Sequence, residues 1–512
     1  MLRAATLVAV LALPAPAFAF SYTVNSTVDT VDADTTDGLC ADASANCTLR
    51  AAIQQANAWP GVDYIVLPAG TFNLPINGSD DVAASGDLDV LENLNITGNE
   101  ATATIIDGAT QHRLFQVFSG STVTLEDLTL QNGLSDSNGG AILVEGNITL
   151  RNVLLRNNSS TLDFSQGGGG IFSSGPNSAV VLDHVTLDNN SAQASGGAIN
   201  ITNGSITIDD SLFTGNTAQL NGGAVNLNGG VDATINNSTF SGNSATGSGG
   251  INGLGGAIFN FAQLTINNST ISGNTALFGG AIYAEGGQSG PIASTLTINH
   301  STISGNTATA TTTDSGGGIF ISNLAAFNNT TITRNTAALS GGGIAMDTAG
   351  NPQNQGYLDL QNAIVAQQTG GGDCSGSVNI TSQGFNLDSD NTCNLGAATD
   401  LPGTLPDMEA ALAANGGATT THALLSTSPA INAVTSGCDN TVNDQRGVQR
   451  ANGTTSGGAC DIGAYEFTSL EATWADLEIT VQDTPDPVLT NGSYSYHITV
   501  TNRGPANATN VT

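Results

Sequence analysis

Short runs of apolar residues, separated by glycine and asparagine, recur along most of the chain. One motif consists of two glycines, a small residue and an apolar β-branched residue. Clear copies of it begin at Gly139, Gly196, Gly222, Gly255 and Gly279. A second motif starts with an apolar residue and two polar residues and ends in Asn-Thr-Ala or Asn-Ser-Ala. Its copies occupy residues 208–218, 235–245, 266–276, 298–308 and 327–337. A repeat length of roughly thirty residues is typical of a solenoid.

The repeat chemistry predicts an all-β fold, a right-handed parallel β-helix in which each repeat forms one turn. β-Branched runs favour strands, and Gly and Asn favour the corners between them. Helical solenoids are excluded because so much Gly, Asn and Thr costs too much helix propensity. A β-propeller is the main alternative, but its blades are longer and carry more aromatic residues than the 5% found here.

Stacked turns of a β-helix lie about 4.8 Å apart, so equivalent side chains become neighbours. Asparagine tolerates the left-handed backbone of a corner and can bond to copies above and below it. One such ladder is predicted to contain Asn216, Asn243, Asn274, Asn306 and Asn335.

Both ends of the repeat region have features expected of caps. Thr48 is predicted to N-cap a short helix over Leu49–Ala58, and residues 62–67 are predicted to be the first strand. Alternating patterns at residues 477–481 and 494–500 predict an antiparallel sandwich module. Such a module needs about a hundred residues, so only part of one is expected here.

The N-terminus predicts a secreted or cell-surface bacterial protein. Arg3 precedes an apolar run at residues 4–15 that is too short to span a bilayer, and Ala17-Phe18-Ala19 is an A-x-A cleavage site. A buried first strand is the alternative interpretation. The expected segments are a signal peptide at 1–19, an N-terminal cap at 20–75, parallel β-helix repeats at 76–356, C-terminal turns with a disulfide-rich cap at 357–467, and an incomplete sandwich module at 468–512.

Six cysteines in an exported chain predict disulfide bonds. They fall into three local pairs, which are Cys40 with Cys47, Cys374 with Cys393, and Cys438 with Cys460. Six cysteines allow about 15 connectivities, and the sequence does not choose among them. Metal binding by these residues is disfavoured because no pair has C-x-x-C spacing and no histidine lies nearby.

The charge narrows the range of partners. The chain has 42 acidic residues, nine arginines and no lysine, which gives a net charge of −33. Nucleic acid and anionic membranes are therefore excluded as partners, and a polyanionic glycan would need bridging calcium. No segment after the signal peptide is long and apolar enough for a transmembrane helix.

Several motifs resemble those of bacterial surface proteins. Residues 47–53, Cys-Thr-Leu-Arg-Ala-Ala-Ile, resemble the CSLREA motif that often precedes a right-handed β-helix, with Thr in place of Ser and Ala in place of Glu. Residues 444–447 and 460–466, Asp-Gln-Arg-Gly and Cys-Asp-Ile-Gly-Ala-Tyr-Glu, are similar to the C-terminal part of the choice-of-anchor β-helix family.

The repeats are similar to those of polymorphic outer-membrane proteins and pectate-lyase-like rods. Residues 500–505 resemble an immunoglobulin-like surface repeat, which makes 468–512 an incomplete immunoglobulin-like module. Together these resemblances imply a secreted or cell-surface protein, and they imply no defined reaction.

Aligning the polar pair before each Thr-Ile segment gives two columns of candidate functional residues. The first column is Glu126, Arg151, Asp183, Asp209, Asn236, Asn267, Asn299 and Asn328. The second column is Asp127, Asn152, His184, Asp210, Asn237, Asn268, His300 and Asn329. Late turns carry mostly Asn, whereas early turns carry charge. The charged members are therefore predicted to lie together on one side of the rod.

Three interpretations of this acidic group stay open. Calcium prefers carboxylate and carbonyl oxygens, and its candidate ligands are Glu126, Asp127, Asp183, Asp209 and Asp210. A pair of acids at glycosidase spacing would be catalytic, and the candidates are Asp183, Asp209 and Asp210 with His184. The third interpretation is a solvated acidic stripe.

Other segments contain polar or aromatic residues that give weaker indications of a functional site. Residues 32–38 are rich in Asp, and a turn is favoured over a calcium loop because no Glu ends the segment. Arg446 is predicted to form a structural ion pair with Asp444, with Asp461 and Glu466 nearby. The aromatic residues that follow the repeats are equally compatible with core positions, stacked ladders or scattered sugar platforms, and they are Phe172, Phe259, Phe261, Phe278, Tyr283 and Phe320.

The favoured hypothesis is a secreted or cell-surface rod that mediates adhesion or binds a glycan or surface ligand without catalysis. The first alternative is a polysaccharide-active hydrolase or lyase acting on one face of the β-helix. A lyase needs a base and cations beside its substrate, and the repeats offer only Arg151, Arg156 and Arg334. The second alternative is a calcium-stabilised structural module of a larger surface protein.

Overall fold

The computed structural model describes most of the chain between residues 19 and 502. The described residues are 19–161, 166–247, 253–286, 294–311, 315–347, 355–376, 379–436, 438, 442–450, 458–468, 477–484 and 495–502. Apart from Ala19, the predicted signal peptide at 1–19 lies outside them, as does most of the predicted immunoglobulin-like module at 468–512.

Strands of the described residues form four long parallel sheets, which we name A to D. Sheet A comprises β1 (Ser21–Thr23), β2 (Val62–Val66), β5 (Asn93–Thr97), β8 (Thr122–Glu126), β12 (Asn147–Arg151), β16 (Ala179–Asp183), β20 (Ser205–Asp209), β24 (Asp232–Asn236), β28 (Gln263–Asn267), β32 (Thr295–Asn299), β36 (Leu324–Asn328), β40 (Tyr357–Gln361) and β43 (Ile380–Gly384). Sheet B comprises β3 (Gly70–Asn73), β6 (Thr104–Asp107), β9 (Thr129–Gln131), β13 (Leu154–Arg156), β17 (Thr186–Asp188), β21 (Leu212–Thr214), β25 (Thr239–Ser241), β29 (Thr270–Ser272), β33 (Thr302–Ser304), β37 (Thr331–Thr333), β41 (Ile364–Ala366), β44 (Leu387–Asp388) and β45 (Leu401–Pro402).

The other two parallel sheets are built from shorter strands. Sheet C comprises β4 (Leu88–Val90), β7 (Phe115–Val117), β11 (Ile142–Val144), β15 (Ile171–Ser173), β19 (Ile199–Ile201), β23 (Val225–Leu227), β27 (Ile258–Asn260), β31 (Ile282–Ala284), β35 (Ile319–Ile321), β39 (Ile344–Met346) and β42 (Cys374–Ser375). Sheet D comprises β10 (Leu134–Ser135), β14 (Ser159–Ser160), β18 (Ser191–Ala192), β22 (Thr217–Ala218), β26 (Ser244–Ala245), β30 (Thr275–Ala276), β34 (Thr307–Ala308) and β38 (Thr336–Ala337).

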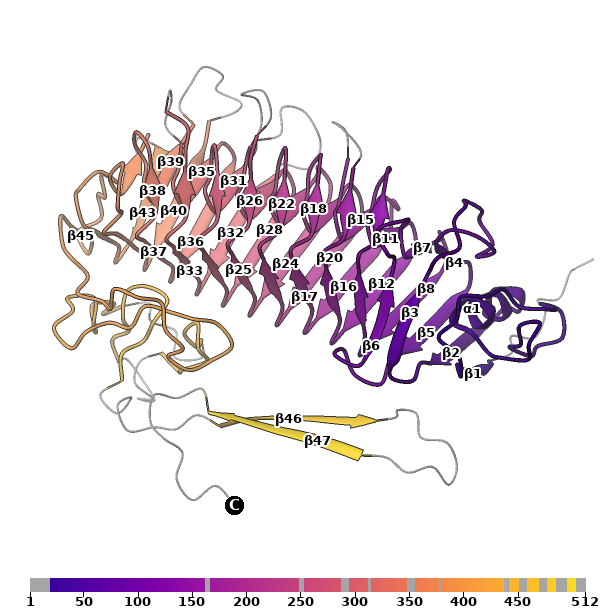
Figure 1. Ribbon diagram of the computed structural model, residues 1–512. Helices are drawn as coiled ribbons and strands as arrows, with labels where there is room; N and C mark the ends of the chain where they lie inside the picture. The colour runs from indigo at the N-terminus through magenta and orange to yellow at the C-terminus, as the bar shows by residue number, and fades with distance from the viewer. Residues whose placement is uncertain are drawn as a thin grey trace, which may run out of the picture.

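The chain winds through the sheets in the order A, B, D, C and then returns to A one turn further along. For example, β20, β21, β22 and β23 form one turn, and β24 begins the next (Figure 1). All strand pairs within the four sheets are parallel, as in the register of β20 against β24, where Ile206 faces Ala233 and Ile208 faces Ile235. The predicted parallel β-helix is therefore confirmed, and the propeller alternative is excluded.

The interior of the rod is a continuous column of apolar side chains. In the sheet A strands from β2 to β40 the second and fourth residues are buried and the others are at least partly accessible, as in β20 and β24. Because turns are in register, each buried residue packs on its equivalents in the turns before and after it, and stability is shared between neighbouring turns.

The glycine pairs close the corner that leads into sheet C. Gly196 has φ of +70°, which L-residues with a Cβ rarely adopt. A Cβ on Gly197 would collide with the carbonyl oxygen of Gly223 in the next turn and with the backbone of Thr217. The first glycine is thus required by backbone conformation and the second by the close approach of turns.

The predicted asparagine ladder is present and fully buried. From Asn216 through Asn243, Asn274 and Asn306 to Asn335, each side-chain Nδ2 donates to the Oδ1 of the next residue at 2.9 Å. The same oxygen also accepts the backbone N–H of the preceding asparagine, for example from Asn216 to Asn243 at 3.0 Å. The ladder is longer than predicted, because Asn158 and Asn190 extend it at one end and Gln368 ends it at the other.

The N-terminal end is closed by the predicted helix. Helix α1 spans Leu49–Ala58, and the Thr48 hydroxyl oxygen accepts the backbone N–H of Ala51 at 3.1 Å. Arg50 of the CSLREA-like motif is fully buried, and its guanidinium donates to Asp29 Oδ1 at 2.6 Å and to the carbonyl oxygen of Gly86 at 2.8 Å. The prediction of the first strand was wrong, because β1 precedes β2 and pairs with it.

At the other end the chain leaves the solenoid after β45 and turns back beside the last turns (Figure 1). It covers the outer face of sheet B. Thr270 Oγ1 donates to the carbonyl oxygen of Thr420 at 2.6 Å, and Thr302 Oγ1 donates to Gln445 Oε1 at 2.6 Å. We call the described residues between 405 and 467 the C-terminal flap. Beyond the flap, β46 (Leu477–Thr484) and β47 (Ser495–Asn502) form an antiparallel pair.

The three disulfides join nearest neighbours in the sequence, namely Cys40 to Cys47, Cys374 to Cys393, and Cys438 to Cys460. Disulfide bonding is therefore confirmed, and the structure selects one of the connectivities that the sequence left open.

The described part of the chain contains no helix of the length and hydropathy that a bilayer crossing requires.

Replacing Asn274 by alanine tests the ladder. Asn274 Nδ2 donates to the carbonyl oxygen of Phe240, and Oδ1 accepts two N–H groups of Asn243. Asn274→Ala leaves these buried groups without partners, and we expect a loss of about 3 kcal/mol in the free energy of unfolding, measured by urea titration with circular dichroism. The matched control is Asn267→Ala in the same turn. Asn267 belongs to a partly buried asparagine ladder, where groups that lose a partner can bond to water. The expected loss in the free energy of unfolding is below about 1 kcal/mol. Equal losses would show that burial does not strengthen the ladder.

Candidate functional site

The acidic group predicted from the repeats lies at the corner between sheets A and B. The register pairs Glu126 with Arg151, Arg151 with Asp183, and Asp183 with Asp209, so the first column is continuous. The second column follows each sheet A strand by one residue. We call Asp183, His184, Asp209 and Asp210, with Arg151, the acidic corner.

The acidic corner brings three of its side chains close together. Asp183 Oδ1 lies 2.6 Å from His184 Nδ1, and Asp183 Oδ2 lies 3.8 Å from Arg151 Nε. One ligand atom from each of Asp183, His184 and Asp210 lies within 4.8 Å of the others. The side chains of Asp183 and His184 are 39% and 56% exposed, so this group faces solvent.

The remaining predicted ligands are placed differently. Asp209 Oδ1 accepts Asn236 Nδ2 at 2.7 Å and so begins the exposed asparagine column of the later turns. Glu126 and Asp127 lie one turn beyond Arg151, whose cationic side chain separates them from Asp183. The five predicted calcium ligands therefore do not converge on one point.

Backbone conformation explains much of the second column. Asp127, Asn152, His184, Asp210, Asn237, Asn268, His300 and Asn329 all have positive φ, between 47° and 55°. This left-handed region is tolerated best by Asn, Asp and His among residues with a side chain. The left-handed backbone therefore explains why Asn, Asp and His recur at this corner. It does not explain why the early turns carry charged residues there.

Asp210 is the member of the acidic corner whose pKa is shifted by its surroundings. Burial raises the pKa of Asp210 above its ordinary value, with His184 and Asn237 opposing the shift and Asp209 and Asp183 adding to it. A carboxylate beside an imidazole can chelate a divalent cation or exchange a proton with a bound sugar. The geometry is compatible with either role.

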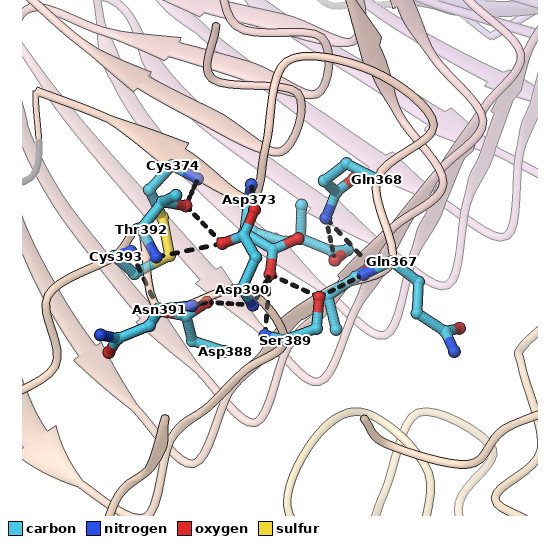
Figure 2. Close-up of a disulfide and its surroundings, with 12 residues drawn as sticks. Gln367, Gln368, Asp373, Cys374, Asp388, Ser389, Asp390, Asn391, Thr392 and Cys393 are labelled. Atoms are coloured by element: carbon cyan, nitrogen blue, oxygen red, sulfur yellow. Dashed lines mark hydrogen bonds between the residues drawn. A yellow bond between two sulfur atoms is a disulfide. The ribbon is translucent and has the colours of Figure 1, made fainter. Parts of the chain in front are cut away.

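A second acidic cluster lies beside the disulfide between Cys374 and Cys393, where sequence reasoning proposed no site. Asp373, Asp388 and Asp390 each place a carboxylate oxygen within 4.8 Å of the others (Figure 2). Asp373 and Asp388 are fully buried. The alternating pattern Asp388-Ser389-Asp390-Asn391-Thr392 was the signal in the sequence that could have indicated this cluster.

Most oxygens of this cluster already accept protein hydrogen bonds. Asp373 Oδ2 accepts Ser389 Oγ at 2.7 Å, and Asp390 Oδ2 accepts the backbone N–H of Asp373 at 3.0 Å. Asp388 Oδ2 accepts the backbone N–H of Cys393 at 3.0 Å, which ties the cluster to the disulfide (Figure 2).

Burial favours the protonated form of the two buried carboxyl groups. Burial raises the pKa of Asp373 to about 7, and burial also raises the pKa of Asp388. The two carboxyl groups place oxygens within 4.8 Å of each other, so a proton on one of them removes their mutual repulsion. Protonation therefore stabilises the buried cluster, and its oxygens are also the ligand type that a hard divalent cation would take.

The other predicted polar groups are structural. In the Asp-rich segment, Asp32 Oδ1 accepts the backbone N–H of Asp34, and Gln55 Nε2 donates to Asp32 Oδ1 at 3.1 Å, as expected of a turn. The ion pair of Arg446 with Asp444 is confirmed at 2.7 Å, and the Arg446 guanidinium stacks 3.6 Å above the ring of Tyr465.

Of the aromatic residues, Phe259, Tyr283 and Phe320 stack in consecutive turns with ring centroids 5.9 and 4.9 Å apart.

A groove on the outer face of sheet A was not predicted from the sequence. It has a volume of about 370 Å³ and runs along the rod across β32, β36, β40 and β43. Its lining includes Thr295, Thr297, Leu324, Ala326, Tyr357 and Asp359. Thr295, Leu324 and Tyr357 stand in one column, and Thr297, Ala326 and Asp359 stand in the next. The small side chain of Ala326 leaves the centre of the groove open.

Residues 169–356 match the family model described as the right handed beta helix region. The match covers the regular turns from sheet C strand β15 onward and supports the predicted right-handed solenoid. No curated protein matches the chain.

Among solved structures, the chain is similar to the catalytic domain of an α-1,3-glucanase in complex with tetrasaccharides. The identity is 16%, 70% of each chain is covered, and the TM-score is 0.39. It is also similar to the pectate lyase Pel9A, with 14% identity, 89% of this chain and 98% of that chain covered, and a TM-score of 0.35. A mannuronic acid specific polysaccharide family 6 lyase from human gut microbiota gives 10% identity, 75% and 91% coverage, and a TM-score of 0.35.

The raised pKa of Asp373 predicts a pH dependence of stability. The pKa of Asp373 is about 7 in the folded chain, above the ordinary value of 3.8, so the folded state binds the extra proton. Its contribution is complete below about pH 4 and falls as the pH rises to about 7. Asp373→Asn imitates the protonated group, and we expect its melting temperature relative to wild type to increase between pH 4 and pH 8.

The control for this measurement is Asp232→Asn, because Asp232 is exposed on β24. Its melting temperature relative to wild type should change little with pH. A difference for Asp373→Asn that stays constant with pH would rule out the raised pKa of Asp373. A rise of the wild-type melting temperature at pH 8 on adding calcium, absent in Asp373→Asn, would show that a cation replaces the proton.

Proposed function

We propose that this protein is an extracytoplasmic rod that binds neutral carbohydrate in the groove on sheet A and does not cleave it. The observation that carries the proposal is an exposed apolar pair in the groove. Leu324 and Tyr357 are 52% and 47% exposed, and they stand in register in adjacent turns. Sugar rings pack on such surfaces through their apolar faces, while hydroxyl and carboxylate groups at the edge bind the sugar hydroxyls.

The apolar pair is not required by the fold. In the preceding turns the same outward column carries Ser205, Asp232, Gln263 and Thr295. Between β20 and β40 the column is apolar only at β36 and β40, next to the carboxylate of Asp359 and the hydroxyl of Thr297. Exposed apolar residues framed by polar groups favour a binding surface.

The charge and the shape of the groove restrict the ligand. A net charge of −33 repels polyuronates, so a neutral glycan is favoured. The groove crosses four strands, and successive turns are about 4.8 Å apart, which is close to the length of one pyranose unit. A chain of about four sugar units lying parallel to the rod would fill it.

The location outside the cytoplasm rests on the disulfides and on the predicted signal peptide. Three disulfides within one chain are typical of an oxidising compartment. The CSLREA-like and choice-of-anchor-like motifs favour a cell-surface position, and adhesion through the groove would follow from glycan binding there.

The acidic corner supports a second candidate, a polysaccharide-active enzyme. Asp183 and Asp210 place carboxylate oxygens within 4.8 Å of each other beside His184. Retaining glycosidases use two carboxyl groups about 5–5.5 Å apart. The same three side chains would hold calcium if the protein were a calcium-stabilised structural module.

The test uses fluorescent neutral oligosaccharides of gluco-, manno- and xylo-type with about four to six units. Binding is measured by fluorescence polarisation. We expect at least one class to bind, and Tyr357→Ala to weaken binding about tenfold, because loss of one aromatic stacking contact costs about 1.4 kcal/mol. Tyr64→Ala is the matched control, since Tyr64 is 40% exposed on the same sheet at the other end of the rod. Equal affinity of both variants would refute the groove as the site.

The enzyme is tested in the same samples by the release of reducing ends or unsaturated sugars. Cleavage by the wild type that is lost in the double variant Asp183→Asn, Asp210→Asn would replace the binding proposal with the enzyme. A rise in melting temperature with calcium, without glycan binding, would favour the structural module.

A further inference from the structure

Asp63 occupies a position that is apolar in the turns that follow. It points into the core from β2 and is completely buried. The register places it in one inward column with Leu94, Val123, Ile148, Val180, Ile206, Ala233, Leu264, Leu296, Ala325 and Leu358. A carboxylate in place of an aliphatic side chain costs desolvation energy unless a cation pairs with it.

The described residues offer Asp63 little compensation. Its Oδ1 accepts the backbone N–H of Phe20 at 2.7 Å, and its Oδ2 is buried without a hydrogen-bond partner among them. Burial and the nearby Glu92 raise the pKa of Asp63 above its ordinary value. The pKa of the Tyr22 phenol is raised to about 12 by burial and by the nearby carboxyl groups of Asp63, Asp32 and Asp37. The ionisable groups that act on Asp63 and Tyr22 are thus acidic.

The nitrogen that contacts Asp63 belongs to the residue after the predicted cleavage site. Ala17-Phe18-Ala19 ends immediately before Phe20 in the sequence. We propose that the chain is cut between Ala19 and Phe20 and that the new α-ammonium group of Phe20 binds the buried carboxylate of Asp63. Hydrolysis adds one water across the Ala19–Phe20 peptide bond, so that Ala19 leaves with a carboxylate and Phe20 keeps the protonated amine.

Contacts with described residues hold Phe20 in place. The backbone N–H of Tyr64 donates to the carbonyl oxygen of Phe20 at 2.9 Å, which continues the β1–β2 pairing by one residue. The Phe20 ring packs against Tyr22 and Trp59 with centroid separations of 6.0 and 6.1 Å. The amine therefore arises at a fixed nitrogen 2.7 Å from Asp63 Oδ1.

Cleavage changes the chemistry of this nitrogen without moving it. A peptide N–H is neutral and donates one hydrogen bond, whereas an ammonium carries a positive charge and donates three. The two added donors supply partners for the Oδ2 oxygen that the peptide N–H leaves unbonded, and the charge compensates the carboxylate. Removal of the leader would thereby complete the first turn of the solenoid and link folding to export.

The absence of lysine makes this amine directly measurable. A chain that begins at Phe20 has the α-amino group as its one primary amine, so an N-hydroxysuccinimide ester acylates that group alone. Only the neutral amine reacts with the ester, and an unperturbed α-amino group has a pKa of about 8. Ion pairing with Asp63 raises this pKa, so the wild type should react slowly at neutral pH.

The experiment first determines the N-terminus of the exported protein by intact mass, for which we expect Phe20. Acylation rates are then measured between pH 6 and pH 10 on the folded protein. We expect Asp63→Asn to react about tenfold faster than wild type at pH 7, with its rate profile shifted down by about one pH unit. Asp81→Asn is the control, because Asp81 is an exposed acid at the same end of the rod, and it should react as the wild type does.

A second form of the chain covers the case in which Asp63→Asn fails to fold. A wild-type chain that starts at Ala19 keeps the Phe20 peptide bond and places its amine one residue away from Asp63. We expect it to acylate at an ordinary rate and to melt at a lower temperature than the chain that starts at Phe20. That difference should be present below about pH 8 and disappear as the pH rises past the raised pKa of the amine.

Three results would each overturn the proposal. They are a native N-terminus at another residue, equal acylation rates for wild type and Asp63→Asn, or equal rates and melting temperatures for chains that start at Ala19 and Phe20. Glycan binding does not enter any of these measurements, so their outcome is independent of the proposed function.

Discussion

The structure depends on turn-to-turn registry, because each turn is completed only by the hydrogen bonds and apolar contacts of the next one. The buried asparagine ladder expresses this most strongly. Asn243 gives both side-chain hydrogens to neighbouring turns and accepts two from the turn before, so a shift of one residue would leave several buried groups without partners. Registry then fixes every outward column as well, which is why the acidic corner and the groove are continuous along the rod.

The corners show how structural and functional demands select the same residue types. A left-handed backbone between sheets A and B favours Asn, Asp and His, which are also the residue types that bind metals and move protons. His184 and His300 share this conformation and differ only in what covers them. His184 is exposed, whereas burial lowers the pKa of His300 to about 4, with Arg450 of the C-terminal flap adding to the shift. Residue type at these corners therefore indicates backbone geometry first and chemistry only after the surroundings are known.

The ends of the rod concentrate its buried charge. Arg50 with Asp29 closes the N-terminal side, and Asp444 with Arg446 stabilises the flap that covers sheet B. Buried pairs of this kind specify how a cap docks, because either partner alone would be strongly unfavourable. With the flap on sheet B, sheet A keeps an open face over the same turns, and the groove with Leu324 and Tyr357 lies there.

The sequence by itself determined the parallel β-helix, helix α1 with its Thr48 cap and the core of the asparagine ladder, because each depends on local propensity repeated at a fixed spacing. It also placed Asp183, His184 and Asp210 on one side, since registry converts sequence period into contact. It did not reveal the buried cluster that contains Asp373 and Asp388, or the groove, or the contact of Phe20 with Asp63. These depend on which residues approach from irregular loops and on which face the flap leaves uncovered. Tertiary structure alone decided them, because such contacts have no period in the sequence and their energies come from burial, which only the folded chain defines.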